Sequence, residues 1–272
     1  MHDPYPFVCY PPPYDWKDPG HKQKQAFFKS VSDHAKFSGF PSMLLKDWMG
    51  GYFPNFIKTG IVIPHQDSEV ELNHSVNPTY FDASKFNLLH AGNLMKQRNP
   101  EGLIKGFKLF LDNNPKAKEE TRLLLLGNAA YHKSFIEKNV ATIPEIHTQL
   151  SNVPFDEVYS LQKKVSVNII LEANSEISPF LPGKFPHCIS AKKLILHLGP
   201  LNSETKRLLG EEYEYHSRVD DVGKIALLIE RLYYIWKEDP NRLVLYREDL
   251  LYYISKDYLK KSINDLLNRS SL

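Results

Sequence analysis

The sequence has little cysteine, almost no excess of charge and no long apolar run. Its two cysteines, Cys9 and Cys188, are far apart and match no metal-ligand spacing, so we expect reduced thiols of a cytoplasmic protein. There are 34 basic and 32 acidic residues, a net charge of +2, which is not typical of a nucleic-acid binder. The apolar runs at 123–126 and 167–171 are too short to span a bilayer, and the start of the chain shows no signal-peptide pattern. These absences favour a globular protein with no nucleic-acid partner.

From residue 86 onward, short apolar runs alternate with amphipathic segments. The apolar runs predict strands at residues 86–91, 122–126, 145–149, 166–171, 193–198 and 213–216. The amphipathic segments predict helices at residues 100–112, 131–139, 156–163, 184–191, 203–209 and 221–237. This alternation predicts an α/β fold, with a Rossmann-like parallel sheet that has helices on both faces.

The beginning of the chain predicts much less structure. After a stretch rich in proline and aromatic residues over 1–20, it shows only about two strands and two helices, one of them at 42–49 and ended by Gly50. An autonomous α/β domain usually needs roughly 100–150 residues, so we interpret residues 1–76 as part of a second α/β domain. The polar segment 69–84 is typical of a linker. The expected divisions are therefore 1–76, 77–240 and a helical segment 241–272.

The loop after the first strand of the regular block is a candidate anion site. Gly92 ends this strand, and Arg98 stands just before a helix that Asn99 can cap. Free N–H groups at a helix start, with a guanidinium beside them, favour an anion. The alternative is an ordinary strand-to-helix connection with Arg98 in solvent.

A second loop, NSEISPFLPGKFPHCISAKK over residues 174–193, follows the strand at 166–171 and carries Lys184 at a helix start. Ligands of parallel sheets bind beyond the carboxyl ends of the strands, where the strand order reverses. Both loops are therefore expected to border one cleft, and two cations there predict a diphosphate ligand. The alternative is that Lys184 is a solvated basic residue in a plain connection.

Four stretches together resemble a known family: HAGNLMKQRNPEGLIKGF, LLLLGN, SNVPFDEVYSL and NIILEANSEISPFLPGKFPHCISAKKLI. They resemble the donor-binding half of GT-B fold glycosyltransferases, most closely the family 4 type, also called group 1. The resemblance covers about residues 77–240. Residues 1–76 resemble the last part of the family's acceptor-side N-terminal domain, and residues 241–272 resemble the helices that pack back toward it.

The resemblance implies retaining transfer of a sugar from a nucleotide-diphosphate-sugar donor to a hydroxyl acceptor, which is a sugar or a lipid-linked molecule. It implies no cofactor and no obligatory metal, and it favours a role in polysaccharide or glycoconjugate synthesis. The alternative is a non-catalytic nucleotide-sugar binding module, or a fragment that needs a partner for the acceptor half. A sugar-nucleotide epimerase is less favoured, because the sequence shows no acidic or histidine pair placed for proton abstraction.

The resemblance also implies donor-binding residues, although it assigns no catalytic residue. Arg98 and Lys184 match basic residues on the diphosphate, and His187 replaces a glutamate that commonly binds the ribose. Asn93 replaces a frequent basic residue, and Pro179 replaces an earlier glutamate. The full expected donor site is Gly92, Asn93, Arg98, Val153, Phe155, Ser178, Pro179, Phe180, Lys184 and His187.

Two features remain outside this site. The segment 250–269 combines basic residues with tyrosines on an amphipathic helix, which is able to meet an anionic membrane surface at the inner face of the membrane. Packing of this helix on its own protein is the favoured alternative. His90, His132 and His147 are scattered, and we expect core or surface roles for each of them.

Overall fold

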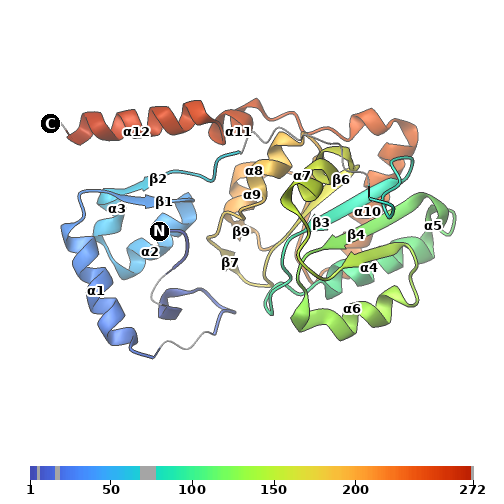
Figure 1. The fold of residues 1–272 in the computed structure, drawn as a ribbon, viewed down its shortest axis with the longest axis horizontal. Helices are drawn as coiled ribbons and strands as arrows, with labels where there is room; N and C mark the ends of the chain where they lie inside the picture. The colour runs from blue at the N-terminus through green and yellow to red at the C-terminus, as the bar shows by residue number, and fades with distance from the viewer. Residues whose placement is uncertain (5–6, 16–18, 68–77, 271–272) are drawn as a thin grey trace.

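The computed structural model describes residues 1–4, 7–15, 19–67 and 78–270 (Figure 1). It consists of a small N-terminal α/β unit and a larger α/β unit, with a C-terminal helix that runs back over the small one. The predicted boundary at 76/77 and most of the predicted linker lie outside the described residues.

The larger unit is built on a six-stranded, wholly parallel sheet. Its strands lie in the order β10-β8-β6-β3-β4-β5. They are β3 (Phe86–Ala91), β4 (Thr121–Leu126), β5 (Ile146–Gln149), β6 (Val167–Leu171), β8 (Leu194–Leu198) and β10 (His216–Ser217). The first strand along the chain, β3, is central, and later strands are added on either side of it. The predicted α/β fold class with a Rossmann-like sheet is confirmed.

One predicted strand is wrong in extent. The strand expected at 213–216 is reduced to His216 and Ser217. Tyr213 joins the sheet through its side chain, because its hydroxyl donates to the Ile195 carbonyl (2.8 Å) and accepts from the Ile195 amide (3.0 Å).

Helices cover both faces of this sheet. They are α4 (Glu101–Asn113), α5 (Ala117–Glu120), α6 (Lys133–Val140), α7 (Phe155–Lys164), α8 (Phe185–Ser190), α9 (Glu204–Leu209) and α10 (Val222–Glu238). Alternate residues of β3 show the two faces: Phe86 and Leu88 join the core that contains α4 and α10, whereas Leu89 and Ala91 join the one under α7. Helices α4 and α10 pack closely because Gly106 has no side chain. A Cβ at this position would lie only 2.6 Å from Ile225 Cγ2.

The small unit contains η1 (Phe7–Cys9), α1 (His21–His34), β1 (Ser38–Phe40), α2 (Met43–Tyr52), α3 (Asn55–Thr59) and β2 (Gly60–Val62). Strands β1 and β2 pair in parallel, and buried Cys9, Phe40 and Phe56 contribute to a separate core. The helix expected at 42–49 continues through Gly50 to Tyr52. A Cβ at Gly50 would lie 2.1 Å from Ile57 Cδ1. This glycine therefore allows α3 to pack closely against α2, and it does not end α2.

The two units are joined at the N-terminus of α2. Glu204, at the start of α9, is fully buried and accepts hydrogen bonds from the Met43 and Leu44 amides, both at 3.2 Å. Arg207 donates to the same carboxylate at 2.7 Å. A buried carboxylate is stable only when such donors satisfy it, so this contact fixes α2 against the larger unit.

The C-terminal segment contains η3 (Pro240–Arg242), α11 (Glu248–Tyr253) and α12 (Lys256–Ser270). Leu250 and Ile254 are buried against the larger core, whereas Ile263 and Leu267 on α12 are 43% and 56% exposed. Figure 1 shows α12, in red, extending back over the small unit. The first part of the segment therefore packs on the larger unit, and on α12 the side chains of Tyr258, Leu259 and Leu266 are half-buried. Among the helices of the described ranges, none is long and apolar enough to span a bilayer.

Replacing the carboxylate that joins the units should destabilise the protein. Glu204→Ala leaves two backbone amides and Arg207 without their acceptor, so we expect the free energy of unfolding in urea to fall by about 2–4 kcal/mol. Glu119→Ala, at an exposed position of α5, is the control. An equal effect of both substitutions would show that the Glu204 contacts do not stabilise the junction.

Candidate functional site

The candidate site lies where the order of the strands reverses. Strands β3 and β6 are neighbours at the centre of the sheet, and the chain continues outward from them in opposite directions. Their carboxyl ends lead directly into Gly92 and Glu172. Such a reversal separates the two connecting loops and leaves a crevice above the strand ends.

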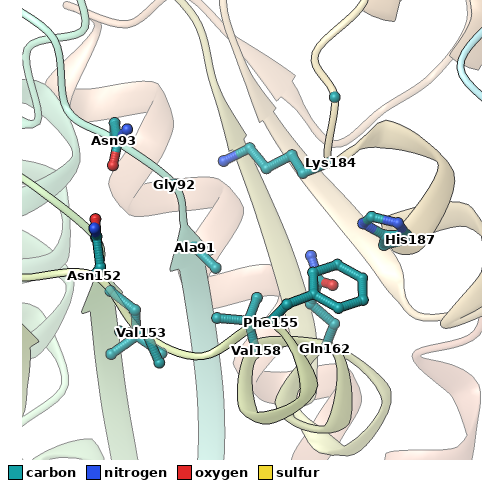
Figure 2. A pocket seen from close by; sticks show the side chains of 13 residues that line it. Ala91, Gly92, Asn93, Asn152, Val153, Phe155, Val158, Gln162, Lys184 and His187 are labelled. Atoms are coloured by element: carbon teal, nitrogen blue, oxygen red, sulfur yellow. The ribbon is translucent and has the colours of Figure 1, made fainter. Parts of the chain in front are cut away.

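A cavity of about 310 Å³ opens at this position (Figure 2). Its walls come from the loops after β3, β4 and β5, from α7 and from the start of α8. Six of the ten expected donor residues line it together: Gly92, Asn93, Val153, Phe155, Lys184 and His187. Apolar walls with a few convergent polar groups are typical of small-molecule sites.

Lys184 carries the charge of this cavity. Its side chain points toward Gly92 (Figure 2), and Nζ donates to His90 Nδ1 at 3.0 Å and to the Ile169 carbonyl at 3.3 Å. The pKa of Lys184 is lowered to about 7, mainly by burial and also by the charge of Arg98, while Cys188 and Glu172 oppose the shift. An anion in the cavity would favour the ammonium form.

Gly92 borders this ammonium group. Its φ of +148° is strained for a residue with a side chain, and a Cβ there would lie 3.5 Å from Lys184 Nζ. The backbone conformation at this position therefore favours glycine.

His90 lies behind Lys184 and is 1% exposed. Burial, followed by the charges of Lys184 and Arg98, holds the pKa of His90 well below its usual value, so the imidazole is neutral. Because Nδ1 accepts from Lys184, the ring proton is assigned to Nε2. The core role expected for His90 is correct, but the residue also positions the lysine, which the sequence analysis did not anticipate.

His187 and Phe155 form an aromatic corner of the cavity. The His187 ring meets Phe155 edge-on, with centroids 5.0 Å apart, and Tyr159 with centroids 5.5 Å apart. Burial lowers the pKa of His187, so a neutral imidazole faces the cavity and can exchange a hydrogen bond with a hydroxyl.

A second cavity, of about 380 Å³, adjoins the first, and Gly183 lines both. Arg98 and Phe180 line this second cavity rather than the first. Arg98 forms a side-chain hydrogen bond with Tyr14, and its buried Nε has no partner among the described residues. Arg98 lies near enough to lower the pKa values of both Lys184 and His90, so the two cations interact from neighbouring cavities.

Ser178 and Pro179 are not brought to these cavities. Both are buried at or just after β7 (Ile177–Ser178), which pairs with β9 (Asn202–Ser203). The Pro179 carbonyl accepts a hydrogen bond of 2.5 Å from Ser42 in the small unit. They line neither of the two cavities that the described residues form there, so their contact with a donor stays a prediction.

The sequence analysis missed a buried acid–histidine chain next to Lys184. Glu172 Oε1 lies 3.4 Å from His197 Nε2, and His197 Nδ1 lies 3.1 Å from His216 Nδ1. Burial, with His197 second, lowers the pKa of His216 to about 3. A histidine pair therefore exists, although it lines neither cavity. The signal was a polar residue directly after β6 and within β8, both apolar strands, and a histidine in the short β10.

No protein-family model matches the sequence, and no curated protein matches it. Solved structures do match. A UDP-forming α,α-trehalose-phosphate synthase from Burkholderia xenovorans aligns with a TM-score of 0.68 at 11% identity, over 98% of this chain and 66% of that one. HepE from Anabaena, solved with UDP and glucose, aligns with a TM-score of 0.63 at 10% identity, over 92% of this chain and 68% of that one.

A glycosyltransferase from Rickettsia africae also aligns, with a TM-score of 0.54 at 12% identity, over 92% of this chain and 68% of that one. The fold is that of the GT-B glycosyltransferases. The chain spans about two thirds of the length of these GT-B proteins.

The buried ammonium predicts a pH-dependent contribution to stability. The unfolded chain holds this proton up to about pH 10.5, whereas the folded protein releases it near pH 7, so the unfolded state binds more protons between these values. Raising the pH from 7 to 9 should therefore stabilise the wild type relative to Lys184→Met by about 1–2 kcal/mol in urea unfolding. Lys133→Met, at an exposed site on α6, is the control. If both variants show the same pH dependence, Lys184 does not titrate as a buried group.

Proposed function

We propose that the chain binds a nucleotide-diphosphate sugar and transfers the sugar, with retention of configuration, to a hydroxyl acceptor. The observation that supports this most is the meeting of two cavities at Gly183, with Lys184 in one and Arg98 in the other. A diphosphate is the ligand whose charge and length suit two cations on either side of such a junction. The nucleoside would then occupy the first cavity, and the reacting sugar would point toward the second.

In the first cavity, the apolar side chains of Val153 and Phe155 offer a wall for the nucleobase. His187 would bind a ribose hydroxyl from the wall of this cavity. Its neutral imidazole can serve as donor or acceptor, although with one nitrogen in each role at a time.

The proposed transfer forms a bond between the acceptor oxygen and the anomeric carbon of the sugar. The bond from that carbon to the diphosphate oxygen breaks, its electron pair stays on the diphosphate, and the hydroxyl proton passes to that oxygen. Lys184, Arg98 and the backbone amide of Gly92 or Asn93 would stabilise the growing negative charge. Fixed charges in a partly buried site act strongly because little water screens them.

The second candidate function is a non-catalytic nucleotide-sugar binding module. It is favoured by His187 and Pro179 at the positions of family glutamates, and by a small unit whose described sheet has only strands β1 and β2. A lipid-linked acceptor and a part in polysaccharide synthesis stay predictions that follow from the resemblance alone. A cytoplasmic location at the membrane face stays a prediction from the cysteines and from the segment 250–269.

A turnover assay separates the two functions. The purified chain is incubated with UDP-glucose, GDP-mannose and other nucleotide sugars, and release of the nucleoside diphosphate is measured with and without sugar acceptors. We expect release that rises with acceptor and falls in Lys184→Met. Nucleotide binding with no release, even at high protein concentration, would favour the binding module.

Arg98→Ala should weaken the binding of UDP or GDP by about tenfold or more. A hydrogen bond to a charged group contributes about 1.5–3 kcal/mol, and a factor of ten corresponds to about 1.4 kcal/mol. The measurement is isothermal titration calorimetry. Arg122→Ala is the matched control, because Arg122 lies at the opposite, amino-terminal end of β4. Unchanged affinity in Arg98→Ala would remove this residue from the site.

A further inference from the structure

Glu172 is a buried carboxylate that the described residues leave without a hydrogen-bond partner. It follows β6 directly, is 3% exposed, and neither Oε1 nor Oε2 has a donor among these residues. His197 Nε2, on β8, lies 3.4 Å from Oε1. An ionised carboxylate at such a position is strongly destabilised unless opposite charges compensate it. The residue therefore depends on cations close to it.

Three neighbouring strands hold this carboxylate in place. The Glu172 amide donates to the Leu198 carbonyl at the end of β8 (2.8 Å). A Cβ at Gly199 would lie 3.1 Å from Glu172 Oε2 and 2.8 Å from His197 Nε2, so glycine leaves the space that both side chains occupy. His197 is fixed in turn, because its Nδ1 lies 3.1 Å from Nδ1 of His216, which is buried on β10. The position of Glu172 is thus determined by β6, β8 and β10 together.

Glu172 lies close enough to act on the groups of the anion site. Burial lowers the pKa of Lys184, and the charge of Glu172 opposes this shift. Burial also raises the pKa of Tyr14, which is hydrogen-bonded to Arg98, and Glu172 adds to that increase. The carboxylate therefore interacts with Lys184 and with the partner of Arg98.

The other ionisable groups that act on Lys184 supply no negative charge near pH 7. Arg98 is a second cation. The His90 imidazole is neutral, because burial holds its pKa well below the usual value. Burial raises the pKa of Cys188 to about 11, so this thiol keeps its proton. Of the described groups that influence the charge of Lys184, Glu172 is thus the one anion.

The histidines next to the carboxylate do not replace it. Burial lowers the pKa of His216 to about 3, and the charges of His197, Lys206 and Lys224 lower it too, so this imidazole is neutral. Within the described part of the chain, these groups add no second anion to the site.

Glu172 acts on the cations from outside the cavities. Lys184 lines the first cavity and Arg98 lines the second, whereas Glu172 lines neither. An anion that enters can therefore contact both cations while the carboxylate stays in place. The charge of Glu172 still reaches them, because little water screens an interaction between buried groups.

We propose that Glu172 is a positioning residue of this site: it is the fixed counter-ion that keeps the ammonium of Lys184 protonated and in place while the cavity is empty. The inference rests on the proposed function only for its link to donor binding. The site is then formed before an anion arrives, and the carboxylate also repels the bound anion.

The titration of Lys184 tests this proposal without any ligand. The full chain is labelled with carbon-13 lysine, and the Cε signal that is missing in Lys184→Met is followed by NMR from about pH 5 to about pH 10. Removal of a nearby opposite charge lowers the pKa of an ammonium group, so we expect the midpoint to fall by about one pH unit in Glu172→Gln. Glu176→Gln, at an exposed position of the same loop, is the matched control and should leave the midpoint unchanged.

A variant that keeps the charge distinguishes electrostatics from a structural defect. Glu172→Asp withdraws the carboxylate on a shorter side chain, so the midpoint should fall by less than half as much as in Glu172→Gln. An unchanged midpoint in both variants, or in Glu172→Asp alone if Glu172→Gln does not fold, would overturn the proposal. A shift as large in Glu172→Asp as in Glu172→Gln would overturn it too.

Calorimetric titration with UDP connects the counter-ion to the donor site. A midpoint that falls from about 7 to about 6 removes the ammonium from a larger share of the variant at pH 8 than at pH 6. The affinity of Glu172→Gln relative to the wild type should therefore be about fivefold higher at pH 6 than at pH 8. A purely structural defect would lower the relative affinity equally at both pH values, which would contradict the proposal.

The two measurements separate this inference from the proposed function. A midpoint that shifts in Glu172→Gln, in a chain that binds neither UDP nor GDP, would support the counter-ion and contradict the proposed donor site. Binding of UDP by a chain in which Glu172→Gln leaves the midpoint unchanged would overturn the inference and leave the proposed function intact.

Discussion

The ammonium group of Lys184 lies inside the protein, and the surrounding structure is arranged to satisfy it. Its acceptors are an imidazole on β3 and a carbonyl on β6. These are the two neighbouring strands at which the strand order reverses. A buried cation without such partners would lose its proton or leave the site. Gly92, which follows β3 directly, borders the same ammonium group. The topology of the sheet thus places both hydrogen-bond acceptors beside the lysine, at the strand ends that border the cavity.

The charges around this lysine favour the binding of an anion. Arg98 brings a second positive charge from the neighbouring cavity, and Glu172 supplies a buried negative charge whose oxygens have no hydrogen-bond partner within the described part of the chain. Below about pH 7, where Lys184 keeps its proton, two cations against one carboxylate leave an excess of positive charge at the strand ends. Because the buried His90 and His216 have lowered pKa values and stay neutral near pH 7, they do not add to this excess.

The sequence predicted the elements of the larger unit well, for a physical reason. Strands such as β3 and β6 are buried on both faces and read as mostly apolar runs that are too short for a helix. It also predicted that the loops after β3 and β6 converge, because parallel strands with crossover helices place all their carboxyl ends at one edge. Gly50 was interpreted wrongly, because a glycine that ends a helix and one that admits a neighbouring helix look alike in sequence.

By itself, then, the sequence determined the α/β class, the central strands and the two loops that carry Arg98 and Lys184, because local periodicity and strand direction are enough for these. Only the tertiary structure decided that the two cations line separate, adjoining cavities and that the Pro179 carbonyl contacts the small unit. It also decided that Tyr10 and Tyr14, near the N-terminus, contact Phe180 in the larger unit. Contacts between segments so distant in sequence depend on how whole units pack, and no local pattern records that packing.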